Sequence, residues 1–433
     1  MKSPSINIIG GGLAGSEAAL QLAHRGINVR LFEMKPRKFS PAHKIPGCAE
    51  LVCSNTFKST LRDRAHGLLK EELQKLGSYL IKIAYETRVP AGDSLAVDRV
   101  LFSEKVTEEI SKNPRIEFIR EEVSTLNDED FFIIATGPLT GESLFKKIQQ
   151  LIGDEDCYFF DAISPIVAAD SIDYSRCFFA NRRDPDGKDY INAPMAQEEY
   201  DLFIHELTHA EEAQVKDFDS KKLFSGCMPI EDMAKRGPKT LAFGPLRPVG
   251  FESYGKRPYA IVQLRREDNA AKMYNLVGFQ TRLKIGEQER VFRMIPGLEK
   301  CEFLRYGSMH RNNFINSPKV LQYDFSLKTQ RNIFFAGQII GVEGYTESIA
   351  SGLLTAQSVL ARMEGKTFIL PHETTMLGGV FKYILEYTGK NFQPMNANFG
   401  LLPHLEKKIG KSDRYAAYAE RALKKIDTTM LIL

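Results

Sequence analysis

The sequence predicts an α/β fold in which one parallel sheet takes strands from both ends of the chain and is interrupted by an inserted α+β domain. Two observations predict this fold. A short apolar run at residues 6–9 is followed by glycines and then by a helical alanine and leucine pattern, and a second glycine-rich turn follows an apolar run at residues 333–336. Strand, tight turn and helix in this order are typical of a doubly wound sheet. We expect its two parts at residues 1–185 and 309–433, the second with a C-terminal helix, and the insertion at 186–308.

The first glycine-rich turn has the spacing of a Rossmann fingerprint. Gly10 would make the turn, Gly12 would let the backbone approach a pyrophosphate, and Gly15 would let helix and strand pack closely. Leu13 and Ala14 open a helix whose free N–H groups attract phosphate. A second apolar strand ends at Glu33, where an acid would accept a hydrogen bond from a ribose hydroxyl. The alternative is a glycine turn in an α/β protein that binds no nucleotide.

Two later segments favour FAD over NAD as the nucleotide, because a simple dehydrogenase does not need them. One is an apolar strand that ends in a small polar turn, and the other is the strand, glycine turn and small-residue helix near the C-terminal end. Gln338 stands where many flavoproteins carry an acid. No second fingerprint occurs, so NADH or NADPH would visit the flavin without a domain of its own. The cofactor-binding candidates in these segments are Ala135, Thr136, Gly137, Gly337, Gln338, Glu343, Gly344, Ser348 and Ser351.

Composition is that of an ordinary globular protein of 433 residues with a net charge of +3. No apolar stretch approaches the ~20 residues that span a bilayer, and the residues before the first strand are too few for a signal peptide. Six cysteines without a CxxC pair indicate reduced thiols and no structural zinc. We therefore expect a cytoplasmic protein with no membrane attachment, no bound metal and no obligate protein partner.

Positive charge is concentrated between Met233 and Arg311, where 16 Lys and Arg face 7 Asp and Glu. Basic residues there alternate with aromatics, and cations that hold phosphates beside rings that stack on bases are typical of RNA-binding surfaces. We expect Arg265 and Arg266 to contact RNA, so neutralising them should weaken binding and flatten its salt dependence. A solvated basic face explains the charge equally well.

Two cysteines are candidate nucleophiles. Cys53 has hydrogen-bond donors and a lysine nearby, and Cys227 lies between glycine and proline in a loop setting. A free cysteine is more often a small buried apolar residue. Cys48 and Cys53 also form a Cys-x4-Cys pair like that of flavin disulfide reductases, but those enzymes carry a separate nicotinamide domain. His310 could face a ring or a phosphate, although a lone histidine is usually structural.

The chain resembles the folate- and FAD-dependent RNA (uracil-5-)-methyltransferases of the TrmFO family, which are related to GidA/MnmG proteins. The resemblance extends over nearly the whole length. It rests on motifs around Cys53, at residues 89–92 and 95–99, around Cys227, at residues 275–281 and 309–312, around Gly344, and at residues 393–400.

The resemblance implies methylation of a tRNA T-loop uridine, with 5,10-methylenetetrahydrofolate as one-carbon donor and FAD, reduced by NADH or NADPH, as reductant. It assigns Cys53 and Cys227 as nucleophile and as base or positioning thiol, with Cys53 favoured as nucleophile. It places His310, Arg311 and Asn312 at the substrate. The one-carbon unit could pass directly or by way of the flavin. A ribosomal RNA substrate, a wobble-uridine flavoprotein of the MnmG type and a non-catalytic RNA-binding flavoprotein are the alternatives.

Overall fold

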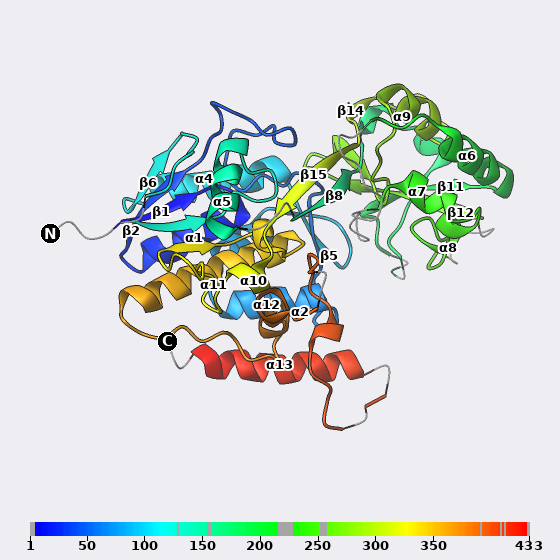
Figure 1. The fold of residues 1–433 in the computed structure, drawn as a ribbon. Helices are drawn as coiled ribbons and strands as arrows, with labels where there is room; N and C mark the ends of the chain where they lie inside the picture. Colours follow the sequence, from blue (N-terminus) through cyan, green and yellow to red (C-terminus); the bar gives the residue numbers. More distant parts are fainter. Residues whose placement is uncertain are drawn as a thin grey trace.

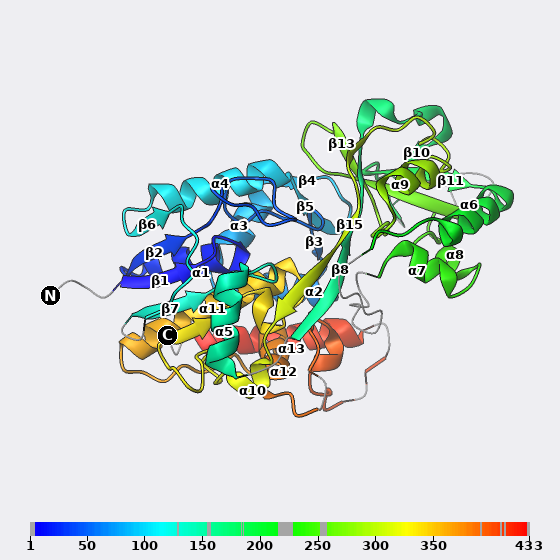
Figure 2. The same ribbon diagram turned by 45° about the horizontal axis from the view of Figure 1, so that its top comes forward.

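The protein consists of two units joined by a pair of long antiparallel strands (Figures 1 and 2). The linking strands are β8 (Cys157–Ile163) and β15 (Ser308–Phe314), paired from Ser308 with Ile163 to Phe314 with Cys157. This computed structural model describes residues 5–127, 130–153, 157–182, 184, 186–214, 228–251, 258–389, 392–407, 409–410 and 413–430. Within residues 157–161, 310–311 and 427–430 it describes the backbone alone.

The first unit is built on a parallel five-stranded sheet with the order β16-β7-β1-β2-β6. Strand β1, at residues 5–9, therefore pairs with β7, at residues 131–134, and β7 pairs in turn with β16, at residues 333–335. The predicted α/β fold is confirmed. The five strands are β1 (Ser5–Ile9), β2 (Asn28–Phe32), β6 (Ile116–Ile119), β7 (Phe131–Ile134) and β16 (Ile333–Phe335).

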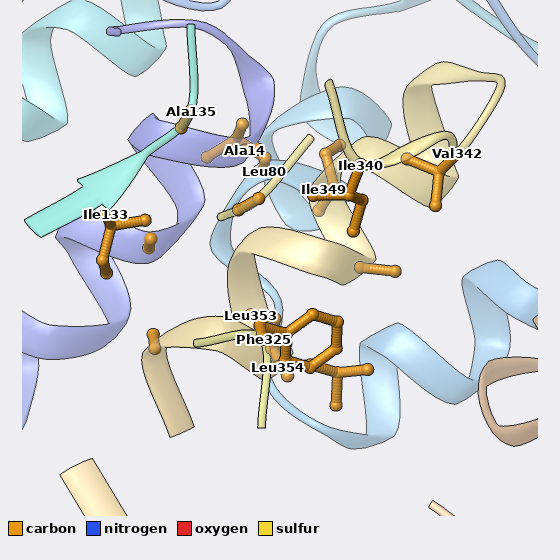
Figure 3. Packing of buried hydrophobic residues seen from close by; sticks show 14 of the residues in the cluster. Ala14, Leu80, Ile133, Ala135, Phe325, Ile340, Val342, Ile349, Leu353 and Leu354 are labelled. Carbon is orange, nitrogen blue, oxygen red and sulfur yellow. The ribbon is translucent and has the colours of Figure 1, made fainter. Parts of the chain in front are cut away.

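Strand β1 is buried on both faces, as is usual for a central parallel strand. Ile6 and Ile8 are fully buried and Asn7 is nearly so. Fully burying one such apolar side chain stabilises the fold by about 1.5–3 kcal/mol. Figure 3 shows the packing of this core, in which Leu353 and Leu354 of the long helix that follows β16 lie beside Phe325.

Helices pack around this sheet, and α1 (Leu13–His24) packs directly against α11 (Tyr345–Met363). A Cβ on Gly352 would lie 2.2 Å from the Ala14 carbonyl oxygen, so glycine is required for the two helices to approach. A small sheet, β3-β5-β4, lies beside the first unit. The remaining elements here are α2 (Ala65–Lys75), α3 (Tyr79–Glu86), α4 (Arg99–Lys112), α5 (Glu142–Ile152), α10 (Ser317–Val320), α12 (Met376–Glu386), α13 (Arg414–Met430), β3 (Thr56–Ser59), β4 (Arg88–Val89) and β5 (Ser94–Val97).

The second unit has a six-stranded sheet with the order β10-β11-β12-β13-β9-β14 and its own hydrophobic core. Its strands β9 (Ile166–Ala168) and β10 (Phe178–Phe179) precede residue 186, where we expected the insertion to begin. The expected boundary therefore falls inside this unit, because β9 pairs with strands from much later in the chain. The other elements are β11 (Tyr190–Met195), β12 (Ala260–Arg266), β13 (Met273–Leu276), β14 (Phe303–Arg305), α6 (Gln197–His209), α7 (Ile230–Lys235), α8 (Thr240–Phe243) and α9 (Ile285–Phe292).

Candidate functional site

The turn between β1 and α1 has no room for side chains at two glycines. Gly10 has φ +103°, and a Cβ there would lie 2.6 Å from the Ala135 carbonyl oxygen. A Cβ on Gly15 would lie 1.9 Å from the Gly10 carbonyl oxygen. Gly12, by contrast, faces open space, and the helix that begins after it has neither a side-chain cap nor an acidic residue in its first turn. The helix N-terminus is therefore free to bind an anion such as a pyrophosphate.

A cleft opens at this turn. It runs between the ends of β1, β7 and β16, which are adjacent strands of the parallel sheet. In such sheets, ligands bind outside the carboxyl ends of the strands. Of the predicted cofactor residues, those that line the cleft are Gly10, Gly12, Leu13, Ala14, Glu33, Ala135, Thr136, Gly137, Gly337, Gln338 and Ser348.

The other four predicted cofactor residues lie behind the lining. Gly15 packs against the turn, and Ser351 accepts a hydrogen bond from the Gly337 backbone at 2.6 Å. Glu343 is buried and accepts a hydrogen bond from the Gln338 side-chain amide at 2.7 Å. Gly344 precedes α11 with φ +123°. These residues shape the cleft wall from behind.

Glu33 is fixed by the backbone around it. Its carboxylate accepts hydrogen bonds from the backbone N–H groups of Gly11 and Lys35, each at 2.9 Å. An acid held at the end of the second strand can also accept a ribose hydroxyl. The open helix N-terminus, this acid and the position of the cleft at the carboxyl ends of the strands fit a dinucleotide such as FAD.

Cys53 lies beside this cleft, since Val52 and Tyr345 both line it. The Tyr345 hydroxyl accepts hydrogen bonds from the backbone N–H groups of Cys53 at 2.8 Å and Ser54 at 3.0 Å. Burial raises the pKa of Tyr345, and a negative charge at Cys53 would raise it further, so the hydroxyl stays protonated. Tyr345, at the start of α11, thus holds residues 50–55, the cysteine loop, against the cleft.

Two arginines from distant segments hold the same loop by its carbonyl groups. Arg99, in α4, donates to the Leu51 carbonyl at 2.7 Å, and Arg305, in β14, donates to the Val52 carbonyl. Burial lowers the pKa of Arg305, and the neighbouring charge of Arg99 adds to that effect. Both cations interact electrostatically with Cys53, so they would stabilise an anion there. Sequence reasoning missed both residues as site residues, although Arg99 lies in one of the family motifs.

Arg265 is placed differently from our expectation of an RNA contact. Its side chain is only 7 % exposed and donates from Nε to the side-chain oxygen of Asn55 at 2.9 Å. Asn55 also donates to the carbonyl groups of Val97 and Arg266. Arg265 therefore joins the second unit to the cysteine loop and does not belong to a solvated basic face. Arg266 is half-buried beside it.

Two predicted residues are placed by their backbone alone. His310 and Arg311 lie on β15 opposite Asp161 and Phe160, and their side chains are among those not described. Cys227 lies outside the described residues. Asn312 is buried on the same strand. The structure therefore does not bring the two candidate thiols together within the part that it describes.

Cys48 differs from Cys53 in its surroundings. It is fully buried, and burial raises the pKa of its thiol to about 12. Both cysteines are free thiols. In the described part of the chain, no cluster of three or more His, Cys, Asp or Glu side chains could hold a metal, and no helix is long and apolar enough to cross a membrane.

The fold and the cleft define a two-unit dinucleotide-binding α/β protein. The sequence pattern of the family described as glucose inhibited division protein A matches residues 5–367. The structure of Aquifex aeolicus GidA superposes with a TM-score of 0.68 at 16% identity, covering 98% of this chain and 73% of that chain. At that identity the likeness shows the fold alone.

Closer relatives define the particular family. The chain is 52% identical to a methylenetetrahydrofolate–tRNA-(uracil-5-)-methyltransferase TrmFO of Natranaerobius thermophilus, over 97% of each chain. It is 53% identical to the protein of the same name from Acetivibrio thermocellus, again over 97% of each. The chain belongs to the TrmFO family.

Proposed function

We propose that this protein methylates C5 of a uridine in tRNA, with 5,10-methylenetetrahydrofolate as one-carbon donor. The observation that carries the proposal is the position of Cys53, which Tyr345 holds at the edge of the dinucleotide cleft. Relatives at about 50% identity over nearly the full length are named for this reaction. Reduced FAD, regenerated by NADH or NADPH, would supply a hydride in that cleft.

The chain's own residues would hold the cofactor at several points. The N-terminus of α1, with Gly12, Leu13 and Ala14, would hold the pyrophosphate, and Glu33 would bind a ribose hydroxyl. Gln338, turned toward Glu343 by its amide group, would take the place of the acid that other flavoproteins use.

Cys53 would act as the nucleophile. Its sulfur adds to C6 of the uracil, which makes C5 nucleophilic enough to bond to the methylene carbon of the folate. C5 then loses its proton, and the bond between the one-carbon unit and the folate nitrogen breaks as that nitrogen takes up a proton, which releases tetrahydrofolate. A hydride added to the one-carbon unit makes it a methyl group as the thiolate leaves C6. Arg99 and Arg305 would steady the thiolate during addition and release, and Cys227 would serve as base or positioning thiol. The products are 5-methyluridine, tetrahydrofolate and oxidised cofactor.

The test is product analysis with unmodified tRNA, a ribosomal RNA fragment, NAD(P)H and methylenetetrahydrofolate labelled with ¹³C in its methylene group. The proposal predicts ¹³C-labelled 5-methyluridine in the tRNA. Labelling of the ribosomal fragment alone would overturn the tRNA assignment. Oxidation of NAD(P)H without label in either RNA would overturn the methyltransferase assignment.

A further inference from the structure

The second unit carries an exposed aromatic ring that no part of the proposed reaction uses. Phe243, the last residue of α8, is 79 % exposed, more than any other large hydrophobic residue of the described chain. It lines an open depression together with Val249 and Tyr259. A largely exposed phenylalanine that lines a depression beside other apolar residues indicates a binding surface.

Hydrogen bonds anchor α8, which carries this ring, and the segments on either side of it. The buried Tyr200 hydroxyl donates to the Pro238 carbonyl at 2.8 Å and accepts from the Ala242 backbone at 3.1 Å. Arg182 donates to the carbonyl groups of Arg247 and Val249 at 2.7 and 2.8 Å. A ring on so fixed a support loses little freedom when a ligand binds.

The charges at the rim favour an anionic ligand. Lys239 and Arg247 line the depression and are exposed. Glu198 is the acid in the lining, so the cations are in excess. Cations beside an exposed ring and an apolar floor match the chemistry of single-stranded RNA, in which phosphates alternate with bases that stack on aromatic faces.

The depression lies away from the proposed site of methylation. Tyr259, which directly precedes β12, lines it, whereas Arg265, six residues further along and near the end of β12, contacts Asn55 in the cysteine loop. At about 3.4 Å per residue the two ends are ~20 Å apart. In Figure 1, α8 likewise lies on the second unit, away from α1 and α11. The target uridine cannot occupy both places.

We propose that Phe243 is a stacking platform for an unpaired base of the substrate RNA outside the reacting uridine, with Lys239 and Arg247 holding the adjoining phosphates. This rests on the proposed function for the identity of the ligand as RNA. The subsite would let the enzyme select an RNA loop over a continuous duplex, because only an unpaired base can stack on the ring.

The test compares binding of a labelled hairpin RNA with a uridine-containing loop and of the same stem sequence as a closed duplex. Phe243→Ala should weaken hairpin binding by about 5- to 150-fold and leave duplex binding unchanged. Phe243→Trp should restore hairpin binding. Ile285→Ala, which removes a residue 57 % exposed on the same unit but outside the depression, is the matched control and should change neither.

The contribution of Lys239 and Arg247 is measured separately, from the salt dependence of RNA binding. Lys239→Gln and Arg247→Gln should weaken binding of both RNAs and should each reduce the slope of log affinity against log salt by about 0.7–0.9. Lys300→Gln, an exposed lysine outside the depression, is the control.

Unchanged hairpin affinity in Phe243→Ala, or an equal loss for hairpin and duplex, would overturn the subsite. Unchanged RNA binding with loss of a dimer would instead make this face a contact between copies, which also overturns it. Methylation of the hairpin by the wild-type protein is measured separately. Its absence would refute the proposed function, whereas the binding comparison still decides the subsite.

Discussion

The Tyr345 hydroxyl lies 2.8 Å from the backbone nitrogen of Cys53, although 292 residues separate them. The same oxygen accepts a second hydrogen bond from Ser54. The Tyr345 side chain, at the start of α11, thus fixes the peptide groups before and after Cys53, the candidate nucleophile. Because Tyr345 also lines the dinucleotide cleft, the cleft and the thiol are held in one arrangement.

Tyr345→Phe should lower methylation turnover at least tenfold while leaving the fold intact. The change leaves two N–H groups without their acceptor, and an unsatisfied buried donor costs about 1–3 kcal/mol, enough to displace the loop. Turnover and bound flavin are measured together. Tyr383→Phe, whose hydroxyl bonds the Gln393 carbonyl away from the cleft, is the control. Normal turnover in Tyr345→Phe would show that the loop does not depend on this hydroxyl.

The ion pair between Arg99 and Glu267 should couple the two units. Its atoms are 2.7 Å apart, and the side chains are 11 % and 2 % exposed. Glu267→Gln leaves Arg99 without its buried counter-charge, so the free energy of unfolding in urea should fall by about 3 kcal/mol or more. Glu373→Gln breaks an exposed pair with Lys382 and should cost less than about 1 kcal/mol. Equal losses in the two variants would contradict this coupling.

Glu347 should make stability depend on acid pH. Burial alone would raise its pKa, but the hydrogen bond and charge of His66, the charge of Lys58 and the backbone N–H of Ala397 together outweigh burial and lower the pKa to about 2, from an ordinary value of 4.5. A lowered pKa contributes stability that is present above pH 4.5 and is lost as the pH falls toward 2. The stability difference between wild type and Glu347→Gln should therefore shrink across that window, by up to ~3 kcal/mol. A difference that is constant with pH would contradict this prediction.

Cys53 should be alkylated well before Cys48. Cys48 is fully buried, and burial raises the pKa of its thiol to about 12, whereas Cys53 is half-buried beside an open cleft. Brief treatment of the folded protein with iodoacetamide at pH 8, followed by peptide mass spectrometry, measures the order. Modification of Cys48 first would mean that the loop opens in solution.

The fold was predictable from sequence because its signals are local. The glycines around residue 12 and the apolar strands next to them lie within a few residues of one another, and together they predict a strand, a tight turn and a helix. Such units form a parallel sheet, as the structure shows. The start of the second unit was not predictable in this way. Strand β9 is only three residues long, and its assignment depends on pairing with strands more than a hundred residues later.

The residues around Cys53 show the same limit. Charge counting placed Arg265 on a basic face, but the pattern of charges along a strand does not say which charges packing will bury. Arg99 and Arg305 meet the loop only through tertiary contacts, so neither spacing nor periodicity could identify them. A family motif that includes Arg99 was the one available signal.

The most direct test of the account measures transfer of the labelled methylene carbon to tRNA by wild type, Cys53→Ala and Cys48→Ala, each loaded with flavin. We expect labelled 5-methyluridine from wild type and Cys48→Ala, and none from Cys53→Ala at equal flavin content. Label from Cys53→Ala at the wild-type rate would contradict the central claim that this thiol, held at the cleft by Tyr345, performs the addition to uracil.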